Sequence, residues 1–100
     1  MGDLLSHQNG GVPLGVAAHN GRTETVQRLL EAGANVNHQN KNGTTALLVA
    51  GWKGHSEVVK LLLGAGARDI PNKFGATALS KARANNHNDV VQYLLQHQPK

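Results

Sequence analysis

One pattern of glycines and apolar residues recurs three times along this chain of 100 residues, and no single motif constrains the fold as strongly. Equivalent positions lie 33 and then 32 residues apart throughout. They are Gly10, Gly43 and Gly75; Leu14, Leu47 and Leu79; Ala17, Ala50 and Ala82; Val26, Val59 and Val91; Leu29, Leu62 and Leu94; and Leu30, Leu63 and Leu95. A fixed period of this length indicates a stack of equivalent units, because one such unit cannot cover its own apolar face and needs a neighbour to do so.

Each unit is predicted to open with a short helix. Pro13 suits the first helical turn, and the hydroxyls of Thr45 and Thr77 suit the cap position before it. Val12 offers no such hydroxyl, so we expect the start of the first short helix to be less stable. The short helix should then end at a residue that tolerates a left-handed backbone, which is Gly21, Gly54 or Asn86 in the three units.

A second helix is predicted to follow in each unit. Its start pairs a capping side chain with an acid that suits the positive end of the helix dipole. These pairs are Thr23-Glu24, Ser56-Glu57 and Asn88-Asp89, and Gly33 and Gly66 end the helix in the first two units. Val and Leu in residues 58–63 form one apolar face at helical spacing. We expect Leu30 and Leu62 alike to lie in the core, where truncation to Ala costs ~2–5 kcal/mol.

The polar stretches 35–42 and 68–74 predict turns or hairpins that project from the stack. The segment from Gly66 to Gly75 is one residue shorter than the segment from Gly33 to Gly43. The shape of this second loop is therefore left open by the sequence.

These residues resemble the ankyrin-repeat family, whose period is about 33 residues and whose signature is Thr-Pro-Leu-His-x-Ala. The matching residues are Pro13, Leu14 and Ala17; Thr45, Leu47 and Ala50; and Thr77, Leu79 and Ala82. The signature His is replaced by Gly15, Leu48 and Ser80, while Gly54-His55 and residues 33–37 resemble the turns of the family. The resemblance covers about residues 8 to 97.

The resemblance implies an all-α solenoid of three helix-turn-helix units, joined by projecting β-hairpin or turn loops. We expect a single domain over residues 1–100, with repeats at about 8–40, 41–72 and 73–97. Lys81 and Arg83 stand where the second unit has Val49 and Gly51, so the third repeat is predicted to be a polar C-terminal cap.

Composition excludes several classes of protein. The absence of Cys excludes disulfide scaffolds, Cys-ligated zinc and thiol nucleophiles. No apolar run approaches the ~18 residues of a membrane-spanning helix, and the N-terminus lacks the basic and apolar regions of a signal peptide. We therefore predict an intracellular protein, cytoplasmic or nuclear, without a membrane segment.

Six histidines raise the question of a metal or catalytic site. His55 and His87 occupy equivalent turns, but no third ligand stands near them in the pattern, and a zinc site needs one. No nucleophile, base and orienting group can be assembled either. We predict no enzymatic activity, no metal and no cofactor.

The resemblance implies a module that binds a partner protein or peptide through its concave groove and loop tips. We name as the predicted contact residues Gln8, Asn9, His19, Asn20, Lys41, Asn42, Thr44, Trp52, Lys53, Lys73, Phe74 and Asn85. Trp52 is the predicted apolar anchor, and the alternative is that it packs against Lys53 or a neighbouring helix. Phe74 either joins that anchor or tucks inward to fill the shortened loop.

The lysines of the groove either steer a partner of acidic character or are simply solvated, and the sequence leaves both open. We expect the chain itself to be a monomer. A net charge of +4 makes nucleic acid the less favoured partner, because no stacking platform accompanies the lysines. Weak electrostatic binding of nucleic acid and a purely structural spacer remain the alternatives. The resemblance also implies that Asn37 is a candidate for hydroxylation by an asparaginyl hydroxylase.

Overall fold

The structure, a computed structural model, describes residues 11–97, with side chains from Pro13 onward. This part of the chain contains six helices: α2 (Gly11–His19), α3 (Thr23–Glu31), α4 (Ala46–Lys53), α5 (Ser56–Gly64), α6 (Ala78–Ala84) and α7 (Asn88–Gln96). They form three helix pairs, as the period predicts. No strand occurs within the described range, so the predicted all-α architecture is confirmed.

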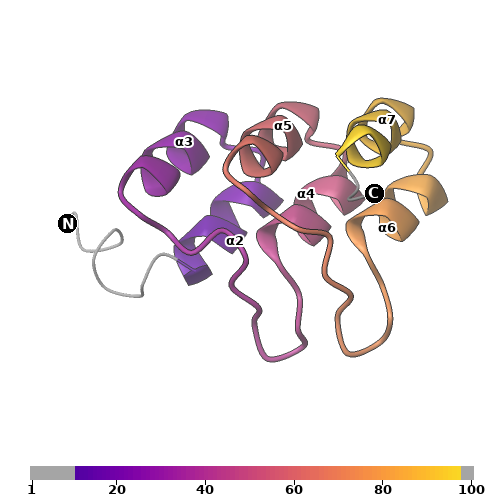
Figure 1. Ribbon diagram of the computed structural model, residues 1–100, viewed down its shortest axis with the longest axis horizontal. Coiled ribbons are helices and arrows are strands. Elements are labelled where there is room, and N and C mark those ends of the chain that lie inside the picture. Colours follow the sequence, from indigo (N-terminus) through magenta and orange to yellow (C-terminus); the bar gives the residue numbers. More distant parts are fainter. Residues whose placement is uncertain (1–10, 98–100) are drawn as a thin grey trace.

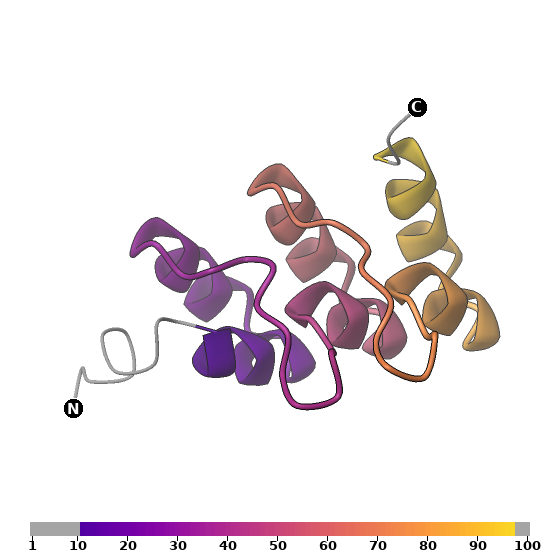
Figure 2. The ribbon, with the colours of Figure 1, turned by 60° about the horizontal axis from the view of Figure 1, so that its bottom comes forward.

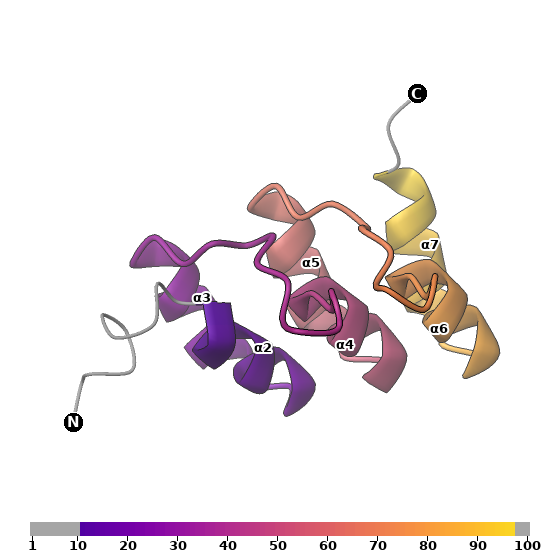
Figure 3. The same ribbon diagram turned by 90° about the horizontal axis from the view of Figure 1, so that it is seen from below.

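The helices form two layers. The inner layer contains α2, α4 and α6, the outer layer contains α3, α5 and α7, and two loops project from the inner layer (Figure 1). Within the layers α4 contacts α2 and α6, and α5 contacts α3 and α7. Turned views show the three pairs standing side by side along the longest axis of the molecule (Figures 2 and 3). The units therefore succeed one another in space in the order of the sequence.

The inner helices start as predicted where a Thr precedes them. The Thr45 hydroxyl accepts a hydrogen bond from the Leu48 N–H at 3.1 Å. Thr77 and Ser80 form a reciprocal pair, in which each side-chain oxygen accepts the other residue's backbone N–H. Both arrangements satisfy donors that a helix start leaves free.

The outer helices do not start as predicted. Thr23, Ser56 and Asn88 are the first helical residues, and the cap positions belong to Arg22, His55 and His87, which make no capping side-chain bond. The turns before them explain the shift. Gly21, Gly54 and Asn86 adopt positive φ angles of 68°, 77° and 61°. In each turn the next N–H bonds back to the carbonyl five residues earlier, so the new helix begins one residue sooner.

The two projecting loops have the same tip. The N–H of Gly43 donates to the Asn40 carbonyl at 2.8 Å, and Gly75 donates to Asn72 at 2.9 Å. In both loops the Asn side chain also accepts two backbone N–H groups further along. The missing residue of the second loop thus precedes Asn72, and the hairpin itself is unchanged.

The core is aliphatic, with alanines where helices approach closely. Its largest fully buried residues are Leu14, Leu47, Leu62, Val26, Val58, Val59 and Val90. The column that contains Leu30 is less buried than the column that contains Leu62: Leu30 and Leu63 are partly buried and pack against the core, and Leu95 is 39% exposed. Successive residues on a helix point about 100° apart, so the column with Leu62 faces the inner layer and the next column lies at its edge.

Candidate functional site

Two histidines join consecutive units at the ends of the inner helices. The Nε2 atom of His55 donates to the His19 carbonyl at 3.0 Å, and that of His87 donates to the Trp52 carbonyl at 3.0 Å. Gly21 and Gly54 lie beneath the two rings, where an added Cβ would stand 2.7 and 2.6 Å from ring atoms. Each ring thus holds a carbonyl at the end of the preceding unit's inner helix, a role that the sequence analysis did not identify.

Trp52 lies at the end of α4 and keeps 40% of its surface exposed. The ammonium nitrogens of Lys53 and Lys81 lie over its ring, 4.7 and 5.9 Å from the centroid. The His19 ring meets it edge-on at 6.4 Å. The indole therefore packs against Lys53 and a neighbouring unit, as one interpretation of Trp52 predicted, while part of it remains open; its role as an anchor for a partner stays a prediction. We call these four residues the Trp52 cluster.

Asn85 holds the backbone of Trp52 in place. Its side-chain amide donates to the Trp52 carbonyl at 3.0 Å, beside the bond from His87. The third unit therefore holds the backbone that carries the indole.

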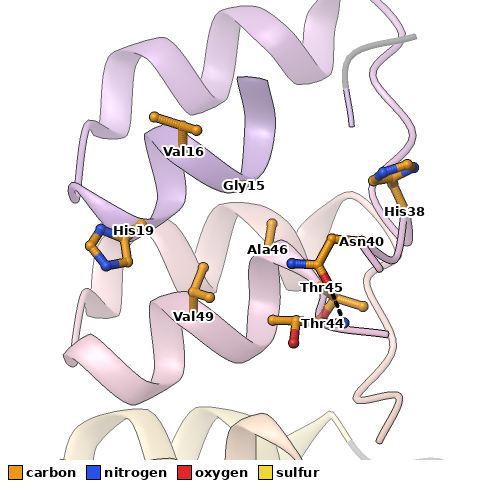
Figure 4. A pocket seen from close by; sticks show the side chains of 9 residues that line it. All are labelled: Gly15, Val16, His19, His38, Asn40, Thr44, Thr45, Ala46 and Val49. Carbon is orange, nitrogen blue, oxygen red and sulfur yellow. Dashed lines mark hydrogen bonds between the residues drawn. The ribbon is translucent and has the colours of Figure 1, made fainter. Parts of the chain in front are cut away.

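A pocket of about 300 Å³ lies between α2, α4 and the first hairpin, and we call it the α2–α4 pocket (Figure 4). It is lined by Gly15, Val16, His19, His38, Asn40, Thr44, Thr45, Ala46 and Val49. Its floor is apolar, and Val16 is 56% exposed. Gly15 leaves open space on this side, since an added Cβ would meet no atom within 4 Å, whereas Leu48 at the equivalent place in the second unit is buried.

The predicted contact residues fall into two groups. His19, Asn20, Trp52, Lys53 and Asn85 lie at the ends of the inner helices, and Lys41, Asn42, Thr44, Lys73 and Phe74 lie on the hairpins. Gln8 and Asn9 lie outside the described residues. The pocket connects the groups, since both His19 and Thr44 line it. Gly15, Val16 and Lys81 belong to the same surface and were missed; the signal was Gly15, an open position inside a helix.

Phe74 does not tuck inward. It stands at the tip of the second hairpin with 73% of its surface exposed, and the Lys73 ammonium lies 5.4 Å from its ring centroid. The two hairpin tips are joined by the Lys73 N–H, which donates to the Asn42 carbonyl at 2.8 Å. Phe74 is thus an exposed aromatic side chain on a hairpin tip that is hydrogen-bonded to the tip of the first hairpin.

Charges are divided between the two layers. On the outer helices Arg28 pairs with Glu24 at 3.0 Å and Lys60 pairs with Glu57 at 3.7 Å. The pKa of the Lys60 ammonium is raised, first by hydrogen bonding to Tyr93 and then by the charge of Glu57. These are the ion pairs found within residues 11–97.

The inner helices and hairpins instead carry cations without acidic partners in the described part of the chain: Lys41, Lys53, Lys73, Lys81 and Arg83. The carboxylate of Asp69 instead accepts the N–H groups of Ala78 and Leu79 at 2.7 and 3.0 Å. The surface that holds the Trp52 cluster is therefore basic.

Asn37 connects two units through its side chain. Its amide donates to the Gly66 carbonyl at 3.3 Å and accepts the Arg68 N–H at 2.8 Å. Its hydroxylation stays a prediction.

The described residues hold no group of three or more His, Asp or Glu side chains that could bind a metal ion. Across residues 11–97, no helix combines the length and the apolar character that crossing a membrane requires.

Comparison with protein families identifies the repeated unit. A model described as "Ankyrin repeats (many copies)" matches residues 14–63. A second model, described as "Ankyrin repeats (3 copies)", matches residues 52–100. A search of curated proteins found no match.

Proposed function

Since this chain belongs to the ankyrin-repeat family, whose repeats are generally protein–protein interaction modules, we propose that it binds a partner protein or peptide on its inner helices and hairpins. The contact surface consists of the predicted contact residues together with the α2–α4 pocket. We propose that the chain does this as a monomer, inside the cell, in the cytoplasm or nucleus, and without catalysing a reaction.

One observation carries this proposal: Trp52 is 40% exposed and has two lysine ammonium groups over its ring, on a face whose cations lack acidic partners in the described residues. Trp is the residue type most enriched among side chains that dominate binding energy. Folding alone does not require a large aromatic side chain at this place, because Ala84 occupies the equivalent position in the third unit. A partner gives that exposed indole a role.

The histidines support a role without catalysis. His55, His87 and His97 each bond through a ring nitrogen to a backbone carbonyl, at 3.0, 3.0 and 2.9 Å. These rings stabilise turns and helix ends.

The test is to select peptides on the immobilised chain from a phage-displayed library of random 12-residue sequences. The affinity of the best peptide is then measured for the parent and for Trp52→Ala. We expect Trp52→Ala to weaken binding by about 2 kcal/mol, which is roughly 30-fold. Leu95→Ala is the matched control, because Leu95 is 39% exposed on the outer helix α7 and Trp52 is 40% exposed on α4. Equal affinity of Trp52→Ala and the parent for every selected peptide contradicts the proposal.

A further inference from the structure

We propose that the partner is an extended acidic peptide that places one apolar side chain in the α2–α4 pocket and its carboxylates beside Lys53 and Lys81. This inference rests on the proposed function and names the chemistry of its ligand.

The pocket is suited to one apolar side chain. Its volume of about 300 Å³ is at the lower end for ligand sites. Val16, Ala46 and Val49 contribute its apolar lining, and Val16 is left 56% exposed. Polar groups from His38, Asn40 and Thr44 stand at the hairpin side (Figure 4). An aliphatic or aromatic side chain would cover the open valine, and the peptide backbone would meet the polar groups.

His19 makes the pocket and the Trp52 cluster one continuous surface. Its ring lines the pocket and also meets the indole at 6.4 Å. The Lys53 ammonium lies 4.7 Å from that indole. Because an extended chain advances ~3.3–3.6 Å per residue, acidic side chains within about three residues of the apolar one would reach the lysines.

Charge decides the character of the partner. The outer-helix cations Arg28 and Lys60 already have glutamate partners, whereas Lys53 and Lys81 have none in the described residues. Both ammonium groups lie over one indole and have no carboxylate partner within residues 11–97, so a carboxylate placed there gains attraction from both. The same groups should accelerate association with an acidic chain at low salt.

The geometry favours a peptide over single-stranded nucleic acid. Bases bind such proteins by stacking on aromatic rings. The ring of Trp52 already has Lys53 and Lys81 over it, at 4.7 and 5.9 Å. The neighbouring pocket has an apolar floor, which does not suit a phosphate.

Gly15 provides a variant that closes the pocket without disturbing the fold. A Cβ added there meets no atom within 4 Å, and the second unit carries a buried Leu48 at the equivalent position. Gly64 is the matched control, since an added Cβ also meets nothing within 4 Å and this residue lies on the outer helix α5. Leu is a better helix former than Gly, so both Gly15→Leu and Gly64→Leu should melt no lower than the parent.

The peptides selected from the random library give the first measurement. We expect Asp or Glu to be enriched within about three residues of one aliphatic or aromatic side chain. The best peptide, labelled with fluorescein, is then titrated against each full-length variant by fluorescence anisotropy. Gly15→Leu should bind roughly tenfold or more weakly, and Lys53→Gln with Lys81→Gln should weaken binding and reduce its salt dependence. Gly64→Leu should match the parent.

The outcomes separate this inference from the proposed function. Neutral or basic selected peptides, or peptides that need Trp52 but bind Gly15→Leu as well as the parent, overturn the inference and leave the proposed function standing. Absence of any Trp52-dependent peptide overturns both. Tighter binding of a 12-nucleotide oligothymidylate than of the best peptide assigns the surface to nucleic acid and overturns the inference. Dimerisation that Gly15→Leu abolishes assigns the pocket to a second copy and also overturns it.

Discussion

At the scale of single residues, the turns between inner and outer helices depend on the absence of a side chain. Gly21 and Gly54 have positive φ angles and also lie beneath histidine rings of the next unit. The corresponding turn of the third unit uses Asn86, also at positive φ. Two separate constraints, the backbone conformation and the approach of a ring, therefore act on the same glycines.

Gly54→Ala separates these constraints. A left-handed Ala costs ~1–2 kcal/mol, and its Cβ would also displace His87 from the Trp52 carbonyl. Loss of that bond adds about 1 kcal/mol, so we expect a total loss of ~2–3 kcal/mol in the free energy of unfolding, measured by urea denaturation. Gly33→Ala is the control, because Gly33 has φ of 92° but an added Cβ meets nothing within 4 Å. Equal losses for the two variants would show that the ring contact does not stabilise the fold.

At the scale of helices, two separate capping arrangements satisfy the backbone N–H groups at the start of α6. Asp69 reaches back from the preceding loop and accepts two N–H groups of the first turn, while Thr77 and Ser80 cap each other. A carboxylate at this end also opposes the positive pole of the helix dipole.

We expect Asp69→Ala to lower the free energy of unfolding by about 2 kcal/mol, because two N–H groups lose a charged acceptor. Asp69→Asn should recover roughly half of this loss, since an amide oxygen still accepts but carries no charge. Thermal and urea denaturation measure both variants. No difference between Asp69→Ala and the parent would contradict the assigned role.

The two leucine columns of the outer helices also differ at this scale. Leu62 is fully buried and Leu95 is 39% exposed. Leu62→Ala should therefore cost ~2–5 kcal/mol. Leu95→Ala should cost under about 1 kcal/mol. Similar losses for the two variants, measured by denaturation, would show that the difference in burial between these columns does not govern the free energy of unfolding.

Much of the architecture was predictable, and the reasons are physical. The period, the caps at Thr45 and Thr77 and the left-handed turns each follow from a local residue preference. The core column could not be separated from its neighbour, because Leu29 and Leu30 are equally apolar. The His55 contact could not be predicted either, since it depends on how neighbouring units meet, and for the α2–α4 pocket Gly15 was the one local signal. The contact role of Trp52 and its neighbours remains a prediction.

At the scale of the whole molecule, the stack is linear and its middle unit has a neighbour on either side. Helix α4 contacts α2 and α6, and α5 contacts α3 and α7. Leu47 is completely buried in the middle unit, whereas the equivalent Leu79 of the third unit is half-buried. In such a stack, the free energy of unfolding is close to the sum of one contribution from each unit and one from each interface between neighbouring units.

Leu47→Ala should accordingly be the more harmful of two equivalent substitutions. We expect Leu47→Ala to lower the free energy of unfolding by about 3–5 kcal/mol. Leu79→Ala should lower it by about 1–2 kcal/mol, because the half-buried Leu79 removes less apolar area from water on folding. Urea denaturation followed by circular dichroism measures both. A larger loss for Leu79→Ala would mean that burial at the middle unit does not govern stability.

The double hydrogen bond to the Trp52 carbonyl has a consequence for association. His87 and Asn85 both donate to this one oxygen, each at 3.0 Å. The main chain beneath the indole is thereby ordered before any ligand arrives, so recognition loses little conformational entropy at this point. Damage to the last repeat should then loosen the backbone of Trp52 one repeat away, and slower association or faster dissociation of the proposed peptide would report it.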